Sequence, residues 1–145
     1  MTLLTEHFTL EQLTYSETAV RKGLDNTPDA ETIENLRELA ETLEQVRELL
    51  GCELHIQSGY RSPKVNAAVG GSKKPPSAHM AGYAADFVAP DFGTPLEVCE
   101  AIEASDIEFD QLIHEFDNWV HISVDPRMRM SLLTIDADGV QKGLA

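Results

Sequence analysis

Basic residues are scarce in this sequence. It has 11 lysines and arginines against 25 aspartates and glutamates, which gives a formal net charge of -14 at pH 7. A protein that binds nucleic acid needs a surface with many basic side chains. A protein that binds an anionic membrane surface needs basic side chains as well. The charge balance therefore argues against nucleic acid and against membrane surfaces as partners.

Cysteines are also few, and long apolar runs are missing. Cys52 and Cys99 are the two thiols, lie outside any C-x-x-C pattern, and are expected to be buried and free. No run approaches the ~18 apolar residues that span a bilayer. Residues 1–8 lack the basic region and apolar core of a signal peptide. We therefore expect a protein made in the cytoplasm, which must be delivered if its substrate lies outside.

The residues that are present predict one folded domain. A chain of 145 residues with 42% hydrophobic residues can bury one core, so residues 1–145 are expected to form a single domain. Apolar residues at helical spacing predict a long helix from Pro28 to Gly51, capped by Thr27. Shorter helices are expected within 8–23 and after Ser62 and Thr94. Strands are expected at 53–57, 83–88, 110–116, 119–124 and 132–135. Because helices come first and strands later, we predict an α+β fold, with N-terminal helices packed on a small, mostly antiparallel sheet.

Two histidines and an aspartate stand out as candidate metal ligands. His79 and Asp86 lie seven residues apart around Gly82, which permits a tight bend, and His121 lies in a strand-like run. Two imidazoles and a carboxylate suit a catalytic zinc, which takes three protein ligands and keeps a fourth position for water. A single histidine is more often a packed or hydrogen-bonded core residue. The combination predicts one Zn²⁺ per chain, bound by His79, Asp86 and His121.

These motifs together resemble a known family. The pattern S-x-H-x-x-G-x-A-x-D from Ser77 to Asp86, followed by W-x-H from Trp119 to His121, is similar to that of the zinc D-Ala-D-Ala carboxypeptidases and murein peptidases (M15-type, with a hedgehog-like zinc fold). The segment 57–62 resembles the S-G-Y-R-S element of the same family. The likeness covers nearly the whole chain, which looks like the short members encoded by bacteriophages and prophages.

The resemblance implies an activity and a place of action. The activity is zinc-dependent hydrolysis of peptide bonds in peptidoglycan stem peptides, as a D,D-carboxypeptidase or an endolysin-type endopeptidase. The expected partner is this peptide substrate, with no nucleic acid or membrane, and we expect a monomer. The missing signal peptide and wall-binding module fit a phage lysis enzyme that a holin releases onto the cell wall.

The resemblance also implies roles for two polar residues. Arg61 stands where the family has an arginine that interacts with substrate near the zinc, and a guanidinium can bind a terminal carboxylate or support a developing oxyanion. Ser77 is a candidate for a hydrogen bond to the substrate backbone. The simpler alternatives are a surface arginine at a helix start and a serine that shapes a turn.

The general base is less clearly marked. Related dipeptidases have a glutamate three residues before the second histidine, whereas this chain has Asn118. We expect Glu115, six residues before His121, to be the base, because hedgehog signalling domains, whose zinc fold this chain resembles, have an acid at that offset, and Asp117 to be the second candidate. A two-residue hairpin turn would pair Glu115 with Val120 on the wrong face, whereas a three-residue loop would bring it beside His121. The simpler alternative for Glu115 is a solvated strand residue.

Three functions therefore remain open. The first is an active zinc peptidase on murein. The second is a binding module that kept the zinc fold and lost turnover, which the asparagine at position 118 keeps open. The third is a dipeptidase that acts on free D-Ala-D-Ala in the cytoplasm. A carboxylate close to the metal would favour the enzymes over the binding module.

Overall fold

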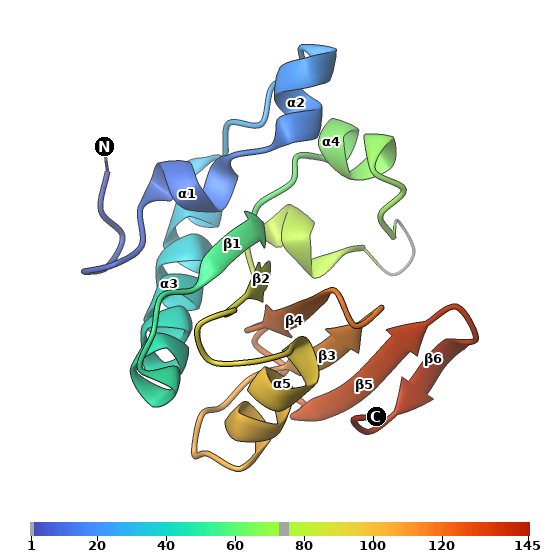
Figure 1. Ribbon diagram of the computed structural model, residues 1–145. Helices are drawn as coiled ribbons and strands as arrows, with labels where there is room; N and C mark the ends of the chain where they lie inside the picture. Colours follow the sequence, from blue (N-terminus) through green and yellow to red (C-terminus); the bar gives the residue numbers. More distant parts are fainter. Residues whose placement is uncertain (1, 73–75) are drawn as a thin grey trace.

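The computed structural model describes residues 2–72 and 76–145, which form a six-stranded sheet with helices packed around it (Figure 1). The order of strands across the sheet is β1-β2-β4-β3-β5-β6. Neighbouring strands run antiparallel except for β3 and β5, which are parallel. The strands are β1 (His55–Ser58), β2 (Ala84–Val88), β3 (Gln111–Glu115), β4 (Trp119–Ser123), β5 (Ser131–Asp136) and β6 (Gly139–Lys142). The predicted α+β class with a mostly antiparallel sheet is confirmed.

In the described part of the chain, three helices precede the first strand, and the other helical elements lie between β1 and β3. The helical elements are α1 (Leu10–Thr14), α2 (Glu17–Lys22), α3 (Ala30–Leu50), α4 (Pro63–Ala68), the 3₁₀ turn η1 (Ala78–Ala81) and α5 (Pro95–Glu103). The predicted start of the long helix is wrong. Helix α3 begins after Asp29, whose carboxylate accepts the main-chain N–H of Thr32, while the N–H of Thr27 donates to Asp25. Asp29 can do this because it stands three residues before that N–H, the usual N-cap position.

The core lies where the helices meet the sheet. Helix α3 buries one apolar stripe, and α5 contacts α3, β3 and β4. The largest fully buried side chains come from α1, α3, α5, the strands and the connecting loops: Phe8, Leu13, Leu36, Leu39, Leu43, Val46, Leu54, Phe87, Ile102, Phe109, Leu112 and Ile122. Each such side chain contributes about 1.5–3 kcal/mol relative to an exposed position. Among the described helices, none is long and apolar enough to cross a membrane.

Both cysteines are free thiols, and their burial differs. Cys99 is fully buried on α5, and burial raises the pKa of its thiol to about 12. Cys52 is only partly buried. The expectation of two buried free thiols therefore holds fully for Cys99 alone.

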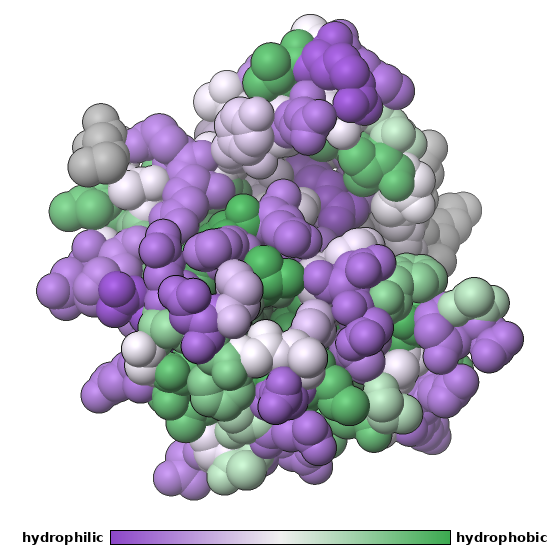
Figure 2. All heavy atoms as spheres, viewed as in Figure 1, coloured by the Kyte–Doolittle hydropathy of each residue, from purple (hydrophilic) through white to green (hydrophobic). Residues whose placement is uncertain are grey.

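The end of the sheet differs from the sequence-based expectation. Strand β5 is followed by a further strand, β6, whereas the run 132–135 was expected to be the last. All four residues of β6 are exposed, so this strand has no buried face, and burial of one face is what produces a recognisable strand pattern in a sequence. Across the face shown in Figure 2, hydrophilic side chains surround small hydrophobic groups.

Candidate metal centre

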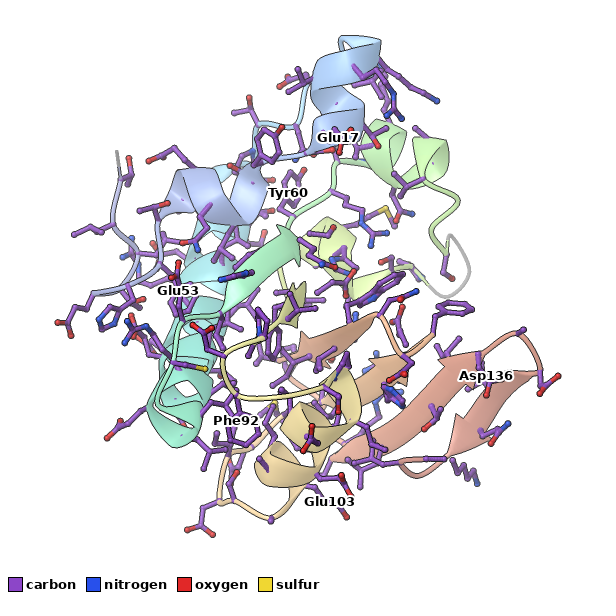
Figure 3. The ribbon with its side chains drawn as sticks, in the orientation of Figure 1. Glu17, Glu53, Tyr60, Phe92, Glu103 and Asp136 are labelled. Carbon is purple, nitrogen blue, oxygen red and sulfur yellow. The ribbon has the colours of Figure 1, made fainter. Side chains whose placement is uncertain are left out.

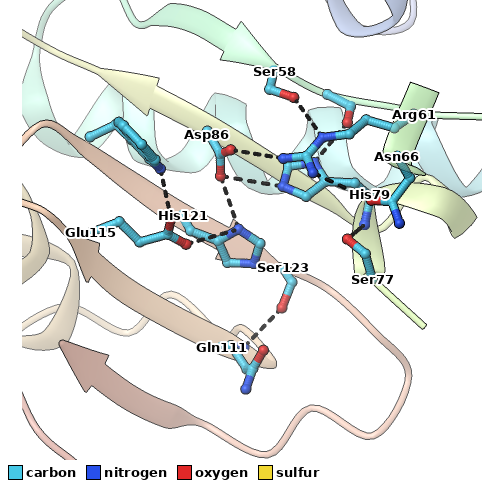
Figure 4. A network of polar contacts seen from close by, with 12 residues as sticks. Ser58, Arg61, Asn66, Ser77, His79, Asp86, Gln111, Glu115, His121 and Ser123 are labelled. Atoms are coloured by element: carbon cyan, nitrogen blue, oxygen red, sulfur yellow. Dashed lines mark hydrogen bonds and ion pairs between the residues drawn. The ribbon is translucent and has the colours of Figure 1, made fainter. Parts of the chain in front are cut away.

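Three separate elements bring the predicted ligands together. His79 lies in η1, Asp86 lies on β2 and His121 lies on β4. The antiparallel register places Asp86 directly opposite His121, and η1 packs against β2 (Figure 4). All three residues are buried, and their potential ligand atoms lie within 4.8 Å of one another. We call these three residues the metal trio.

The spacing of the trio fits a zinc ion. The distance from Asp86 Oδ1 is 3.4 Å to His79 Nε2 and 2.9 Å to His121 Nδ1. Two ligands of a tetrahedral zinc stand about 3.4 Å apart when each bond is about 2.0–2.2 Å. The distance from Asp86 to His79 matches this value. The distance from Asp86 to His121 is shorter, because these two side chains share a hydrogen bond. The donor set of two nitrogens and one oxygen is that of catalytic zinc.

The orientation of His79 is set by a main-chain carbonyl. Its Nδ1 donates to the carbonyl oxygen of Gly59 at 2.7 Å, which leaves Nε2 unprotonated and directed at Asp86. Gly59 lies against the backbone of Leu13 in α1, at a place where a Cβ would collide with the Leu13 carbonyl. The lack of a side chain at Gly59 therefore lets the segment after β1, whose carbonyl holds His79, pack against α1.

The bend between the first two ligands requires the predicted glycine. Gly82 ends η1 with φ of 79°, a left-handed conformation that side chains other than glycine's rarely adopt. Ser77 begins the same turn, and its Oγ accepts the main-chain N–H of His79 at 3.2 Å. This contact shows Ser77 as a capping residue. Its predicted hydrogen bond to substrate stays a prediction.

Arg61 lies beside the trio. Its Nη2 contacts Asp86 Oδ2 at 3.4 Å, Nη1 contacts Asn66 Oδ1 at 3.4 Å, and Nε donates to Ser58 Oγ at 3.2 Å (Figure 4). The Arg61 side chain is 16% exposed, so it is not the surface arginine of the simpler alternative. It also lines a cleft of about 300 Å³ between α2, β1 and α4. The guanidinium therefore connects the metal trio to an open cleft.

The hairpin between β3 and β4 has the three-residue loop. Glu115 pairs with Trp119, and Ile113 pairs with His121, so Glu115 and His121 share a face of the sheet. The distance from Glu115 Oε1 to His121 Nδ1 is 3.8 Å, and Oε2 accepts the indole N–H of Trp119 at 3.0 Å. Glu115 is therefore not a freely solvated strand residue, since its carboxylate is held beside the trio.

The side chain of Asp117 points away from the trio and toward His114. Its Oδ1 lies 2.9 Å from Nε2 of His114, a buried histidine whose Nδ1 contacts the main-chain oxygen of Ala145 at 2.8 Å. The Asp117 side chain is 75% exposed at the tip of the hairpin. Of the two candidate bases, the structure thus brings Glu115, and not Asp117, to the trio.

Burial and neighbouring charges shift the pKa values in the centre. Burial opposes ionisation of Asp86, yet the two histidines hold its pKa well below the usual range. Burial lowers the pKa of His79. Burial also opposes the charged form of His121, but the hydrogen bond to Asp86 together with the charges of Asp86 and Glu115 outweighs it and raises the pKa of His121. Burial, helped by the charge of Asp86, raises the pKa of Glu115. A carboxylate with a raised pKa suits proton transfer near neutral pH.

Two residues that contact Arg61 were not predicted from the sequence. Ser58 and Asn66 hold Arg61, and Asn66 also donates to the carbonyl of Ser72. Asn66 is fully buried although asparagine is usually exposed. No local pattern marks this role, because Asn66 lies on α4 (Pro63–Ala68) and meets Arg61 and Ser72 only in the folded protein.

The fold and the centre define the class of protein. A buried set of two imidazoles and a carboxylate, with a further carboxylate and a guanidinium beside it, is the arrangement of a metal-dependent hydrolase. The family model for Peptidase M15 matches residues 6–123, so the chain belongs to this family of zinc peptidases. No curated protein matches the sequence.

Proposed function

We propose that this peptidase hydrolyses peptide bonds in peptidoglycan stem peptides, as a D,D-carboxypeptidase or an endopeptidase, with Glu115 as the general base. The observation that carries the proposal is the Glu115 carboxylate, held 3.8 Å from His121 on the same face as the trio. A partly buried carboxylate beside the trio, with a pKa raised by burial and by the charge of Asp86, favours an enzyme over a binding module. The choice of peptidoglycan rests on the motif resemblance.

The residues of the trio fit zinc and would hold it through His79 Nε2, Asp86 Oδ1 and His121 Nδ1. Zinc bound there supplies Lewis-acid activation of a water molecule and of the substrate carbonyl. Glu115 accepts a proton from the attacking water and returns it to the leaving amine. Trp119 holds the carboxylate in place through its indole N–H.

Arg61 has a separate role in this proposal. Its Nη1 and Nη2 each carry two N–H groups, and each uses one of them on Asn66 or Asp86. The remaining N–H groups are available to substrate, either to a terminal carboxylate or to the oxyanion that develops on the carbonyl. Ser77 is proposed as a second substrate contact.

The decisive test is Glu115→Gln. We expect this variant to keep its fold and its zinc, because the two side chains have nearly the same shape and Trp119 can still donate to the amide oxygen. Hydrolysis should fall by at least ~10²-fold, since an amide cannot accept the proton. The measurement is release of D-Ala or of cross-linked fragments from purified murein, with zinc content determined for each protein.

Asp117→Asn is the matched control, because it makes the same chemical change two residues away, at the exposed tip. It should retain most of the activity. Full activity in Glu115→Gln together with loss in Asp117→Asn would make Asp117 the base. A wild-type protein that binds zinc but releases nothing from several murein types would favour the binding module. Turnover of free D-Ala-D-Ala without release from murein would favour the cytoplasmic dipeptidase.

The place of action is a further part of the proposal. We propose that the enzyme reaches the cell wall after holin-type release in a phage-infected bacterium, and that it works as a monomer. The support for the place of action is the resemblance to the short phage members. Lysis of outer-membrane-permeabilised cells by added enzyme, without lysis when it is expressed alone in the cytoplasm, is the expected result.

A further inference from the structure

The residue after Glu115 has an unusual conformation. Phe116 has φ of 53° and Asp117 has φ of 54°, so both central residues of this turn are left-handed. The main-chain N–H of Asn118 donates to the carbonyl of Glu115 at 3.0 Å, which closes the turn. Turns with positive φ at both central positions favour glycine, asparagine and aspartate. A phenylalanine in this conformation costs stability.

The packing of Phe116 does not account for that cost. The side chain is 47% exposed, so it contributes little to the core. Its main-chain N–H donates to the carbonyl of Ile135 at 2.7 Å, a bond that almost any residue could make. Its ring contacts Trp119, with ring centroids 6.0 Å apart. Strain of this kind, kept without burial in return, is typical of functional positions.

The position of this aromatic pair relates it to the chemistry. The indole N–H of Trp119 donates to Glu115, and the centroid of the Phe116 ring lies 6.0 Å from that of the Trp119 ring, so the aromatic pair extends outward from the proposed proton shuttle. Arg61 contacts Asp86 Oδ2, whereas His121 and then Glu115 lie toward Oδ1 (Figure 4). The guanidinium and the aromatic pair therefore approach the trio from different sides.

The role of Glu115 decides which part of a peptide lies there. A group that protonates the leaving amine must be within hydrogen-bond reach of that nitrogen. A chain that continues from the leaving amine therefore starts next to Glu115, and the pair of Phe116 and Trp119 is the aromatic surface beside it. A single small leaving residue would cover little of this aromatic surface, whereas a longer leaving segment would bury it.

We propose that Phe116, supported by Trp119, binds the leaving segment of the substrate, and that the enzyme therefore prefers peptides that continue beyond the first residue after the cut bond. This inference rests on the proposed function, and it favours endopeptidase cleavage over removal of one terminal residue. Phe116 is then a substrate-binding residue whose strained backbone is retained for contact with the leaving peptide.

The test compares wild type with Phe116→Asn on two synthetic stem peptides that share the same cut bond. One peptide ends with the residue after the bond, and the other continues for two more residues. We expect kcat/KM on the longer peptide to fall about tenfold, mainly through a higher KM, with little change on the shorter one. The Tm should rise by about 2–4 °C, because asparagine adopts positive φ at lower cost.

Two variants complete the experiment. Phe92→Asn is the matched control, since Phe92 is 41% exposed in the loop before α5, away from the metal centre (Figure 3). It should leave both peptides unaffected. Phe116→Tyr keeps the ring and should retain activity on the longer peptide, which separates contact by the ring from the shape of the loop.

Two outcomes would overturn the inference. Unchanged kinetics of Phe116→Asn on both peptides would show that the ring does not touch substrate. Equal loss on both peptides would show that the loop only positions Glu115. Inactivity of the wild-type protein on both peptides is a different result, because it contradicts the proposed function itself.

Discussion

At the scale of single residues, two members of the metal trio have a second polar atom engaged by a fixed partner. His79 uses Nδ1 on Gly59, and Asp86 uses Oδ2 on Arg61. The first contact fixes the tautomer of His79, and both contacts fix the direction of the candidate ligand atom without a metal ion. The contact with Asp86 also holds the Arg61 guanidinium in the place where it is proposed to meet substrate.

Arg61→Lys is therefore expected to be far from conservative. A lysine cannot reproduce the fork that contacts Ser58, Asn66 and Asp86 together. We expect kcat/KM to fall by about 10²-fold with zinc content unchanged. The measurement is peptide hydrolysis with zinc determination, and Arg127→Lys, at an exposed site, is the control. Wild-type kinetics in Arg61→Lys would remove Arg61 from the catalytic machinery.

The sequence predicted these residues to different degrees. His79, Asp86 and His121 could be proposed together because zinc accepts few donor types and Gly82 marks the bend between two of them. Asn66 could not be proposed, because its role depends on α4 folding back over the loop near Ser72, and no local pattern encodes that contact.

At the scale of elements, the β3–β4 hairpin decides whether Glu115 belongs to the centre. The sequence left two loop lengths open, since Phe116 is a poor turn residue and the asparagine and aspartate beside it suit either length. The observed register follows from pairing on both sides, because β3 is also bound to β5, whose Ile135 accepts the N–H of Phe116. A neighbouring strand thus fixes a turn that local preferences alone do not.

The loop between β4 and β5 is held by a buried carboxylate. Asp110, which is 1% exposed, accepts three hydrogen bonds from Arg129, one from its main chain and two from its guanidinium. These bonds to Arg129 hold the pKa of Asp110 below its usual range. The stability they supply is therefore fully present above about pH 4 and is lost as the pH falls below it.

Asp110→Asn is expected to lower the free energy of unfolding by about 2 kcal/mol at pH 7, because charge-assisted bonds are replaced by weaker ones. The difference from wild type should shrink below about pH 4, since the wild-type protein must then protonate Asp110. Thermal unfolding at pH 7 and pH 3 measures both values. Asp138→Asn, in the exposed turn before β6, should show no such difference. A difference in the free energy of unfolding between wild type and Asp110→Asn that is larger at pH 3 than at pH 7 would contradict this role of Asp110.

At the scale of the whole molecule, the metal centre joins parts of the chain that are distant in sequence. His79 follows a loop, and Asp86 and His121 lie on neighbouring strands of the sheet. The sequence predicted most of these elements, yet the parallel pairing of β3 with β5 brings together strands that are separated by β4 in the chain. That order depends on long-range contacts, which local patterns do not contain.

Zinc held by the trio would stabilise the folded chain relative to the unfolded chain, so its removal should destabilise the whole domain. At free zinc about 1,000-fold above Kd the expected stabilisation is about 4 kcal/mol, which corresponds to a rise in Tm of about 10 °C. Removal of the zinc by a chelator should lower the Tm again by the same amount. In the double variant His79→Ala, His121→Ala the Tm should not respond to zinc, whereas His7→Ala, His55→Ala, which also loses two imidazoles, should respond as wild type does. Stoichiometric zinc retained by the first double variant would place the metal elsewhere.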